Sequence, residues 1–244
     1  MKIGIFGDSF SGSNGPTSWT TLLKQSYEQV ENFSEAGSSL FHGYQHFIKN
    51  YKNFDTIIFT ITAPGRLYTD IPTPDLCICN LFVVEHLMGL PDIKQNRYYN
   101  EIKAAEQYYM YLQNKEFDLF AHDSIIEKIV KLTKEASIKL ILLPCMREGL
   151  GSVAELFRFC TKDFHLSLIN ELEREFFKIP HKGMHFERKD RLQNHISDEN
   201  NIVLADLVKE MIDGNNIVMD LSMFNPCPAT DVDVYYNMEE IRKL

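Results

Sequence analysis

Short apolar runs alternate with longer segments of helical periodicity along much of the chain. The short runs predict strands at 2–6, 29–33, 55–62 and 138–143. Apolar residues recurring every three or four positions predict helices at 17–25, 38–50, 101–135, 152–178 and 198–211, and Ser38 is the candidate cap of the second. Strands that alternate with helices favour parallel pairing in a sheet that helices cover on both faces. The expected fold class is therefore α/β, a three-layer sandwich with a mainly parallel sheet.

Two segments depart from this alternation. The segment 63–97 holds four prolines and reads as an irregular, lid-like insertion beside the end of a strand. From 214 to 244 the pattern weakens, and we interpret that stretch as a C-terminal extension. Residues 1–213, which include the insertion, form one expected domain, a size that α/β folds often use as a single unit.

Composition and charge exclude some classes of protein. The formal net charge of -9 argues against a general nucleic-acid binder, which needs an excess of Lys and Arg. No run of 18 apolar residues is present, so we expect no membrane span. The five cysteines form no C-x-x-C pair and no signal peptide is evident, so we expect reduced thiols in the cytoplasm.

Candidate chemistry begins directly after the first expected strand, at Gly7-Asp8-Ser9. Ligands of parallel α/β sheets bind at the carboxyl ends of the strands, so this turn faces the expected site. A serine there can begin the next helix, where backbone N–H groups stabilise developing negative charge. The alternative is an Asp-Ser turn that simply ends a strand, and the local sequence leaves both interpretations open.

Three further positions fit a site at the same edge. Gly37 follows the second expected strand, where a residue without Cβ lets a backbone N–H approach a substrate oxygen. Thr62 ends the third strand and carries a hydroxyl. His195 precedes the last expected helix and could accept the proton of Ser9 during attack and return it to the leaving group.

This order of motifs resembles the SGNH/GDSL hydrolase family over residues 1–213, and the block Ile5-Phe6-Gly7-Asp8-Ser9-Phe10 is its most specific part. The resemblance implies a flavodoxin-like three-layer fold and the hydrolysis or transfer of acyl esters. It implies Ser9 as nucleophile, with an oxyanion hole from the N–H groups of Ser9 and Gly37 and a side chain of the third block.

The segment Asn194-His195-Ile196-Ser197 and the Asn-rich helix start after it are similar to family members tied to glycan modification. The resemblance therefore implies a serine ester hydrolase acting on O-acyl, and above all O-acetyl, groups of a small-molecule or glycan ester. Two alternatives stay open: an O-acyltransferase that uses the same site, and a catalytically weak carbohydrate-binding protein of this fold. The sequence specifies neither the acyl group nor the oligomeric state.

The chain departs from the family pattern at two places. The third block usually carries Gly-x-Asn-Asp, whereas this chain reads Ile61-Thr62-Ala63-Pro64-Gly65-Arg66, so the asparagine donor is missing. Thr62 is the candidate substitute, and Arg66 could place a positive charge near the substrate. The pattern Asp-x-x-His would put an acid at 192, where this chain has Leu192. Asp190 is the candidate acid, and otherwise a backbone carbonyl could orient His195 in a Ser-His dyad.

Other patterns carry weaker chemistry. The loop 12–17 matches no phosphate-binding motif, so flavin binding is disfavoured and we expect no cofactor. His42 and His46 lie four apart without the glutamate of H-E-x-x-H, and Cys77 and Cys79 form a lone C-x-C, so we expect no metal. The basic residues within 174–191 fit a solvated surface better than a rim for anionic substrates. Four aromatic residues are expected in the core: Trp19, Phe41, Phe47 and Phe59.

Overall fold

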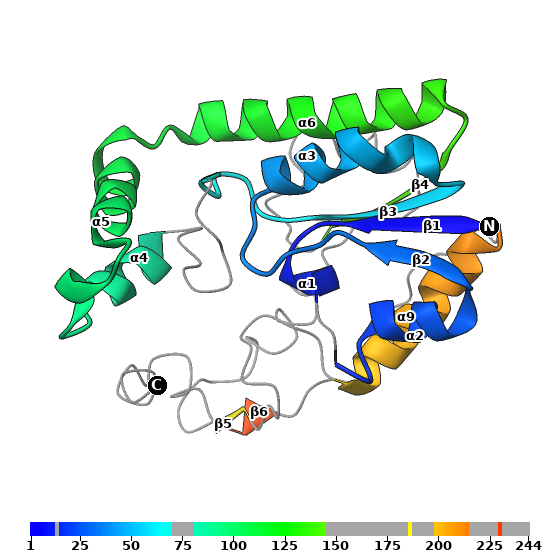
Figure 1. The fold of residues 1–244 in the computed structure, drawn as a ribbon, viewed down its shortest axis with the longest axis horizontal. Coiled ribbons are helices and arrows are strands. Elements are labelled where there is room, and N and C mark those ends of the chain that lie inside the picture. The colour runs from blue at the N-terminus through cyan, green and yellow to red at the C-terminus, as the bar shows by residue number, and fades with distance from the viewer. Residues whose placement is uncertain (13–14, 70–80, 145–184, 187–197, 215–228, 231–244) are drawn as a thin grey trace.

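The computed structural model describes residues 1–12, 15–69, 81–144, 185–186, 198–214 and 229–230. Four strands form a sheet in the order β2-β1-β3-β4, and every neighbouring pair is parallel (Figure 1). The strands are β1 (Lys2–Phe6), β2 (Gln29–Asn32), β3 (Thr56–Ile61) and β4 (Lys139–Pro144). The expectation of a parallel α/β sheet is confirmed.

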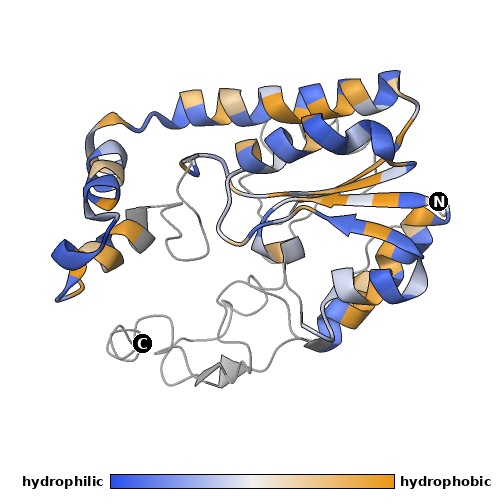
Figure 2. Ribbon diagram, viewed as in Figure 1, coloured by the Kyte–Doolittle hydropathy of each residue, from blue (hydrophilic) through white to orange (hydrophobic). Residues whose placement is uncertain are grey.

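Helices cover both faces of this sheet (Figure 1). On one face, α2 (Trp19–Ser26) and α9 (Asp198–Ile212) pack against alternate strand residues such as Ile58. On the other, α3 (Leu40–Asn50) and α6 (Lys115–Glu135) pack against the intervening residues, such as Phe59. Figure 2 shows the apolar colour that runs along the strands between the two helix layers. The three-layer arrangement is therefore confirmed.

Side-chain caps fix where three of these helices begin. The Ser18 hydroxyl accepts the N–H of Thr21 at the start of α2, and the Ser39 hydroxyl accepts the N–H of His42 at the start of α3. The Asn114 side chain caps α6 in the same way. Each cap satisfies an N–H that has no partner inside its own helix. As a result, α2 begins two residues later than predicted, and α3 is capped by Ser39 in place of the expected Ser38.

The region between β3 and β4 differs from the prediction. The expected single helix at 101–135 is wrong: the chain forms α5 (Tyr99–Gln107), the π-helix η4 (Tyr108–Leu112) and α6. The insertion at 63–97 is partly helical, with α4 (Leu81–Met88) and the 3₁₀ turn η3 (Ile93–Gln95). Together with α5 and η4 these elements bury a separate apolar cluster: Val84, Ile93, Ile102, Ala105 and Tyr109.

The core prediction holds for three of the four aromatic residues. Trp19, Phe47 and Phe59 are buried, whereas Phe41 is only half-buried. Phe41 lies at the start of α3, where its ring meets Tyr68 edge-on instead of the sheet.

The remaining described elements are short. They are α1 (Ser9–Gly12), the 3₁₀ turn η1 (Tyr51–Asn53), and the antiparallel pair β5 (His185–Phe186) and β6 (Ala229–Thr230). The helix expected at 152–178 lies outside the described residues. Among the described helices, none has both the length and the apolar character that crossing a bilayer requires.

Candidate functional site

The turn that follows β1 places Ser9 at the carboxyl end of a central strand. Gly7 has a φ of 152°, and a Cβ built on it would lie 1.7 Å from the Thr60 hydroxyl oxygen of β3. Only glycine fits this close approach of two strands. The chain then turns at Asp8, and Ser9 begins α1 as a half-buried residue. The expected position of Ser9 after the first strand and at the start of a helix is confirmed.

Asp8 holds the first turn of α1. Its side-chain Oδ1 accepts the N–H of Phe10 at 3.2 Å, and its carbonyl accepts the N–H groups of Ser11 and Gly12. These bonds engage the N–H groups that follow Ser9 in the turn. No described residue forms a hydrogen bond with the Ser9 hydroxyl.

A set of buried hydroxyls connects this turn to the neighbouring strands. The Ser11 hydroxyl lies 2.7 Å from the hydroxyl oxygens of both Ser34 and Thr60. Ser34 belongs to the loop after β2, and Thr60 lies near the end of β3. Because buried hydroxyls need partners, the three groups hold the ends of three adjacent strands in register.

The loop after β2 carries Gly37 and lies directly against the turn of Ser9. The Glu35 N–H and the Ser38 hydroxyl both donate to the carbonyl of Gly7, each at 3.2 Å. Gly37 has a φ of 72°, a left-handed conformation that glycine adopts without a steric penalty. The structure therefore brings the Gly37 loop and the Ser9 turn together, as the sequence predicts.

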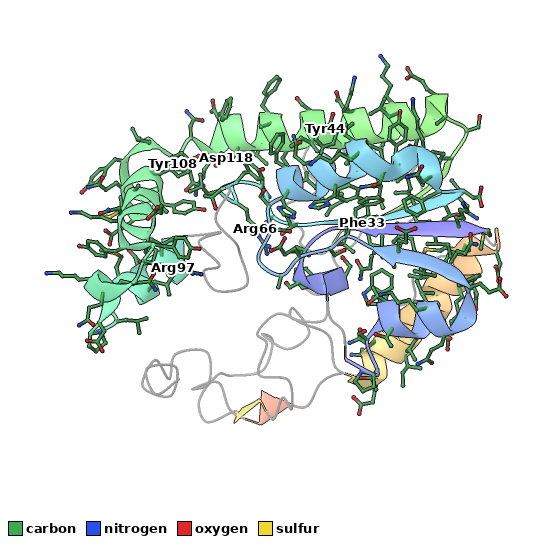
Figure 3. The ribbon with its side chains drawn as sticks, in the orientation of Figure 1. Phe33, Tyr44, Arg66, Arg97, Tyr108 and Asp118 are labelled. Atoms are coloured by element: carbon green, nitrogen blue, oxygen red, sulfur yellow. The ribbon has the colours of Figure 1, made fainter. Side chains whose placement is uncertain are left out.

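Arg66 joins both of these loops to the loop that follows β3. One guanidinium nitrogen, Nη1, donates to Asp8 Oδ2 at 2.9 Å and to the Ser38 carbonyl at 3.1 Å. Asp8 is buried, and the Arg66 side chain is only 12% exposed. In Figure 3, Arg66 lies beside α1, far from the helical segment that carries Arg97. The Arg66 charge is thus paired with a carboxylate of the protein.

Thr62 lies immediately after β3 and is anchored by a histidine of α6. His122 Nε2–H donates to the Thr62 carbonyl at 2.9 Å, and Nδ1 of the same ring lies 3.8 Å from Asp123 Oδ1. Burial lowers the pKa of His122 because it disfavours the charged imidazolium, and the two oxygen neighbours only partly oppose this effect. The Thr62 hydroxyl is buried and has no described hydrogen-bond partner.

The loop after β3 is also held from the side of α5 and α6. The side chain of Gln113 donates to the Gly65 carbonyl and to the Asp118 carboxylate, and the Tyr109 hydroxyl accepts the N–H of Leu67. Figure 3 shows Asp118 and the neighbouring Tyr108 where η4 meets α6. The backbone on either side of Arg66 therefore rests on the helical segment between β3 and β4.

We define the strand-end junction as residues 7–12, 33–39 and 60–66, the loops and strand ends described above. It contains four of the six residues that the sequence predicts for the site, namely Ser9, Gly37, Thr62 and Arg66. The other two, Asp190 and His195, lie outside the described residues, so their assignments stay predictions.

Sequence reasoning missed the partners that hold these residues. Asp8 stands inside the quoted motif, but its pairing with Arg66 spans 58 positions and no local pattern indicates it. Ser38 was expected to cap a helix, and instead its hydroxyl and carbonyl link two loops. His122 gave one usable signal, a histidine on the apolar face of a predicted helix.

The histidines of α3 form a separate pair. His42 Nε2 lies 3.0 Å from Glu35 Oε2, and the rings of His42 and His46 are 4.8 Å apart between centroids. The pKa of His46 is lowered, first by burial and then by the charges of His42 and Lys49. Over the described part of the chain, no group of three His, Cys, Asp or Glu residues has an arrangement that could hold a metal ion.

Comparisons with known proteins give distant likenesses. No family model matches the sequence, and no curated protein matches it. The acetyl xylan esterase AlAXEase is 12% identical with a TM-score of 0.49, over 87% of this chain and 100% of that one. The lipase/acylhydrolase from Enterococcus faecalis is 16% identical with a TM-score of 0.46, and the match covers 90% of this chain and 98% of that one.

The psychrotrophic esterase EstA from Pseudoalteromonas sp. is 12% identical with a TM-score of 0.46, over 87% of this chain and 96% of its own. These likenesses are too distant to define the fold, which follows from the strand order and the two helix layers of this chain.

Proposed function

We propose that this chain is a serine ester hydrolase of the SGNH/GDSL type that removes O-acyl groups, above all O-acetyl groups, from a carbohydrate. The observation that carries the proposal is the strand-end junction. A serine begins a helical turn after the central strand, and the loops of two adjacent strands are hydrogen-bonded to that turn. The matching order of sequence motifs adds independent support.

In the proposed reaction Ser9 Oγ attacks the ester carbonyl carbon while His195 accepts the hydroxyl proton. The carbonyl oxygen gains negative charge, which the N–H groups of Ser9 and Gly37 stabilise together with the Thr62 hydroxyl. The C–O bond to the alcohol then breaks, and His195 returns the proton to the leaving alcohol. Water, activated by the same histidine, hydrolyses the acyl-serine and regenerates Ser9.

Thr62 fits the role of the third donor. Its hydroxyl is buried yet has no described hydrogen-bond partner, so its proton is not committed within the described protein. A buried hydroxyl without a partner is costly and calls for an explanation. Donation to a substrate oxygen supplies one, and it would replace the asparagine that the family's third block usually provides.

The orienting acid is proposed to be Asp190, which would hold the imidazole of His195 in the tautomer that accepts the serine proton. A backbone carbonyl in its place would leave a Ser-His dyad. The Asp190→Asn variant distinguishes the two arrangements, because a triad loses roughly 10⁴-fold in kcat when its acid becomes an amide. A dyad would keep its kcat.

The direct test is hydrolysis of p-nitrophenyl acetate by the purified chain and by Ser9→Ala and His195→Ala variants. Ser26→Ala is the matched control, since Ser26 ends α2 and its hydroxyl donates only to the helix carbonyl of Leu22. We expect both site variants to lose activity and the control to keep it. Equal activity in all four proteins would remove Ser9 and His195 from the proposed reaction. Activity in none of them would replace the hydrolase with a binding protein of the same fold.

A cytoplasmic location is part of the proposal and is supported by the cysteine pattern. A natural substrate would then be an acylated sugar or glycan precursor available inside the cell.

A further inference from the structure

We infer that Arg66 is a positioning residue whose guanidinium holds the Ser9 turn and the Gly37 loop in one fixed arrangement. The inference rests on the proposed function and concerns the same site. It assigns the Arg66 charge to the organisation of the site, whereas the sequence alone suggested contact with the substrate.

The geometry of one nitrogen carries the argument. Nη1 of Arg66 has two N–H groups, and its two acceptors belong to different loops: Asp8 Oδ2 in the turn after β1 and the Ser38 carbonyl in the loop after β2. Asp8 and Ser38 each neighbour a proposed oxyanion donor in the sequence. A single planar group therefore fixes the spacing between the two segments that carry the donors.

The base from which Arg66 extends is itself fixed. Gly65 has a φ of 78° and its carbonyl accepts from Gln113, while the N–H of Leu67 donates to the Tyr109 hydroxyl at 3.0 Å. These partners belong to the helical segment between β3 and β4. Arg66 therefore joins the ends of three strands and is itself anchored to this helical segment, and fixed placement of this kind is what reacting groups need.

Burial strengthens the bridge. Asp8 is 1% exposed, so its carboxylate meets Arg66 and the Phe10 N–H in a site with little water. Removing the guanidinium would leave a buried carboxylate without its countercharge, which destabilises a protein. A loss of activity in an Arg66 variant can thus have two causes, lost stability or lost positioning, and the experiment must separate them.

The experiment compares wild type with Arg66→Met, Arg66→Lys and the double variant Asp8→Asn/Arg66→Met. For each protein we would measure kcat and KM on p-nitrophenyl acetate, the melting temperature, and the fraction of active sites titrated by a fluorophosphonate. Arg97→Met is the matched control, because Arg97 lies over the Tyr98 ring in the helical segment, away from the junction.

We expect Arg66→Met to lower kcat per titrated site about 10²-fold with little change in KM, since misplaced groups cost turnover more than binding. Arg66→Lys should recover part of kcat. The Asp8→Asn change keeps an oxygen that can accept the Phe10 N–H and removes the unpaired charge. The double variant should therefore regain the melting temperature that Arg66→Met loses, while its kcat stays low.

Recovery of kcat together with the melting temperature in the double variant would overturn the inference, because Arg66 would then only balance the Asp8 charge. An Arg66→Met variant with wild-type kcat would also overturn the inference. In both cases the proposed function would stand if the fluorophosphonate still labels Ser9 in wild type. A wild type that neither hydrolyses the ester nor labels would overturn both.

Discussion

The body of the sheet and the strand-end junction both contain fully buried residues, but the buried groups of the two regions are chemically opposite. In the body, Ile57, Ile58 and Phe59 of β3 are completely buried and contact apolar side chains of both helix layers. In the junction, Asp8 and Ser11 are also buried, yet they are held by hydrogen bonds and an ion pair. Apolar contacts tolerate small shifts, whereas hydrogen bonds depend on direction. Substitutions in the body should therefore change stability with little effect on turnover, whereas substitutions in the junction should disturb the geometry of the site.

The largest expected effect on stability lies in the body, at Phe47. Its ring is fully buried and packs near the rings of Phe6, Tyr51 and Phe59. Phe47→Ala should lower the free energy of unfolding by about 3–5 kcal/mol, through lost burial and the cavity that remains. Denaturant unfolding measures the loss. Turnover per folded molecule should stay at the wild-type value, and a matching fall in turnover would break the division between body and junction.

Thr62→Val, within the junction, should have the opposite result: turnover falls while stability is kept. The two side chains have similar shapes, and the change removes a buried hydroxyl that has no described partner. Stability should therefore be unchanged or higher. The kcat should fall roughly 10²–10³-fold if the hydroxyl donates to the oxyanion, and Thr62→Ser should restore it. A valine variant with full activity would remove Thr62 from the proposed site.

Substitution of two glycines with positive φ, Gly7 and Gly214, distinguishes the cost of backbone strain from the cost of close packing. Gly7→Ala would place a methyl group against the Thr60 hydroxyl, whereas a Cβ at Gly214 (φ 98°) meets nothing within 4 Å. Both variants carry strain from their φ angles, so Gly214→Ala serves as the control. We expect Gly7→Ala to lose about 1–3 kcal/mol more in the free energy of unfolding, as for overpacked sites. Equal losses would mean that the β1–β3 contact adapts without cost.

The smallest expected effect is the pH dependence of stability that comes from His122, which is hydrogen-bonded to the Thr62 carbonyl. Burial lowers the pKa of His122 in the folded state, so near and below its ordinary value of 6.5 the unfolded chain binds more protons. This histidine therefore makes the protein less stable as the pH falls below about that value. His122→Gln can keep an N–H donor toward Thr62 and cannot be protonated. Its melting temperature should fall less between pH 7.5 and 5.5 than that of wild type. All other titratable groups are the same in the two proteins, so the difference reports on His122 alone.

The sequence predicted the body of the fold well because local patterns determine it. The apolar runs located the four strands of the parallel sheet to within one residue at each end, and they placed Ser9, Gly37 and Thr62 after three of those strands. The break between α5 and α6 was missed because apolar residues continue through 108–112, where a π-helix forms. Asn114 was the available signal, since it is a helix-capping residue in the middle of the expected helix.

The contacts that hold the junction could not be predicted in the same way. Arg66 and Asp8 are 58 positions apart, and His122 and Thr62 are 60 apart. Helical or strand periodicity shows which face a residue occupies, but it does not show which loop it meets. Only the strand order β2-β1-β3-β4 brings these loops together.

The central claim is that Ser9 is an activated nucleophile, and labelling with a fluorophosphonate followed by tryptic peptide mapping tests it most directly. Cleavage after Lys2 and Lys24 releases residues 3–24, which contain Ser9. We predict one label on this peptide, located at Ser9 by fragmentation and absent from Ser9→Ala. A wild-type protein that remains unlabelled, or that carries its label on another serine, would contradict the account.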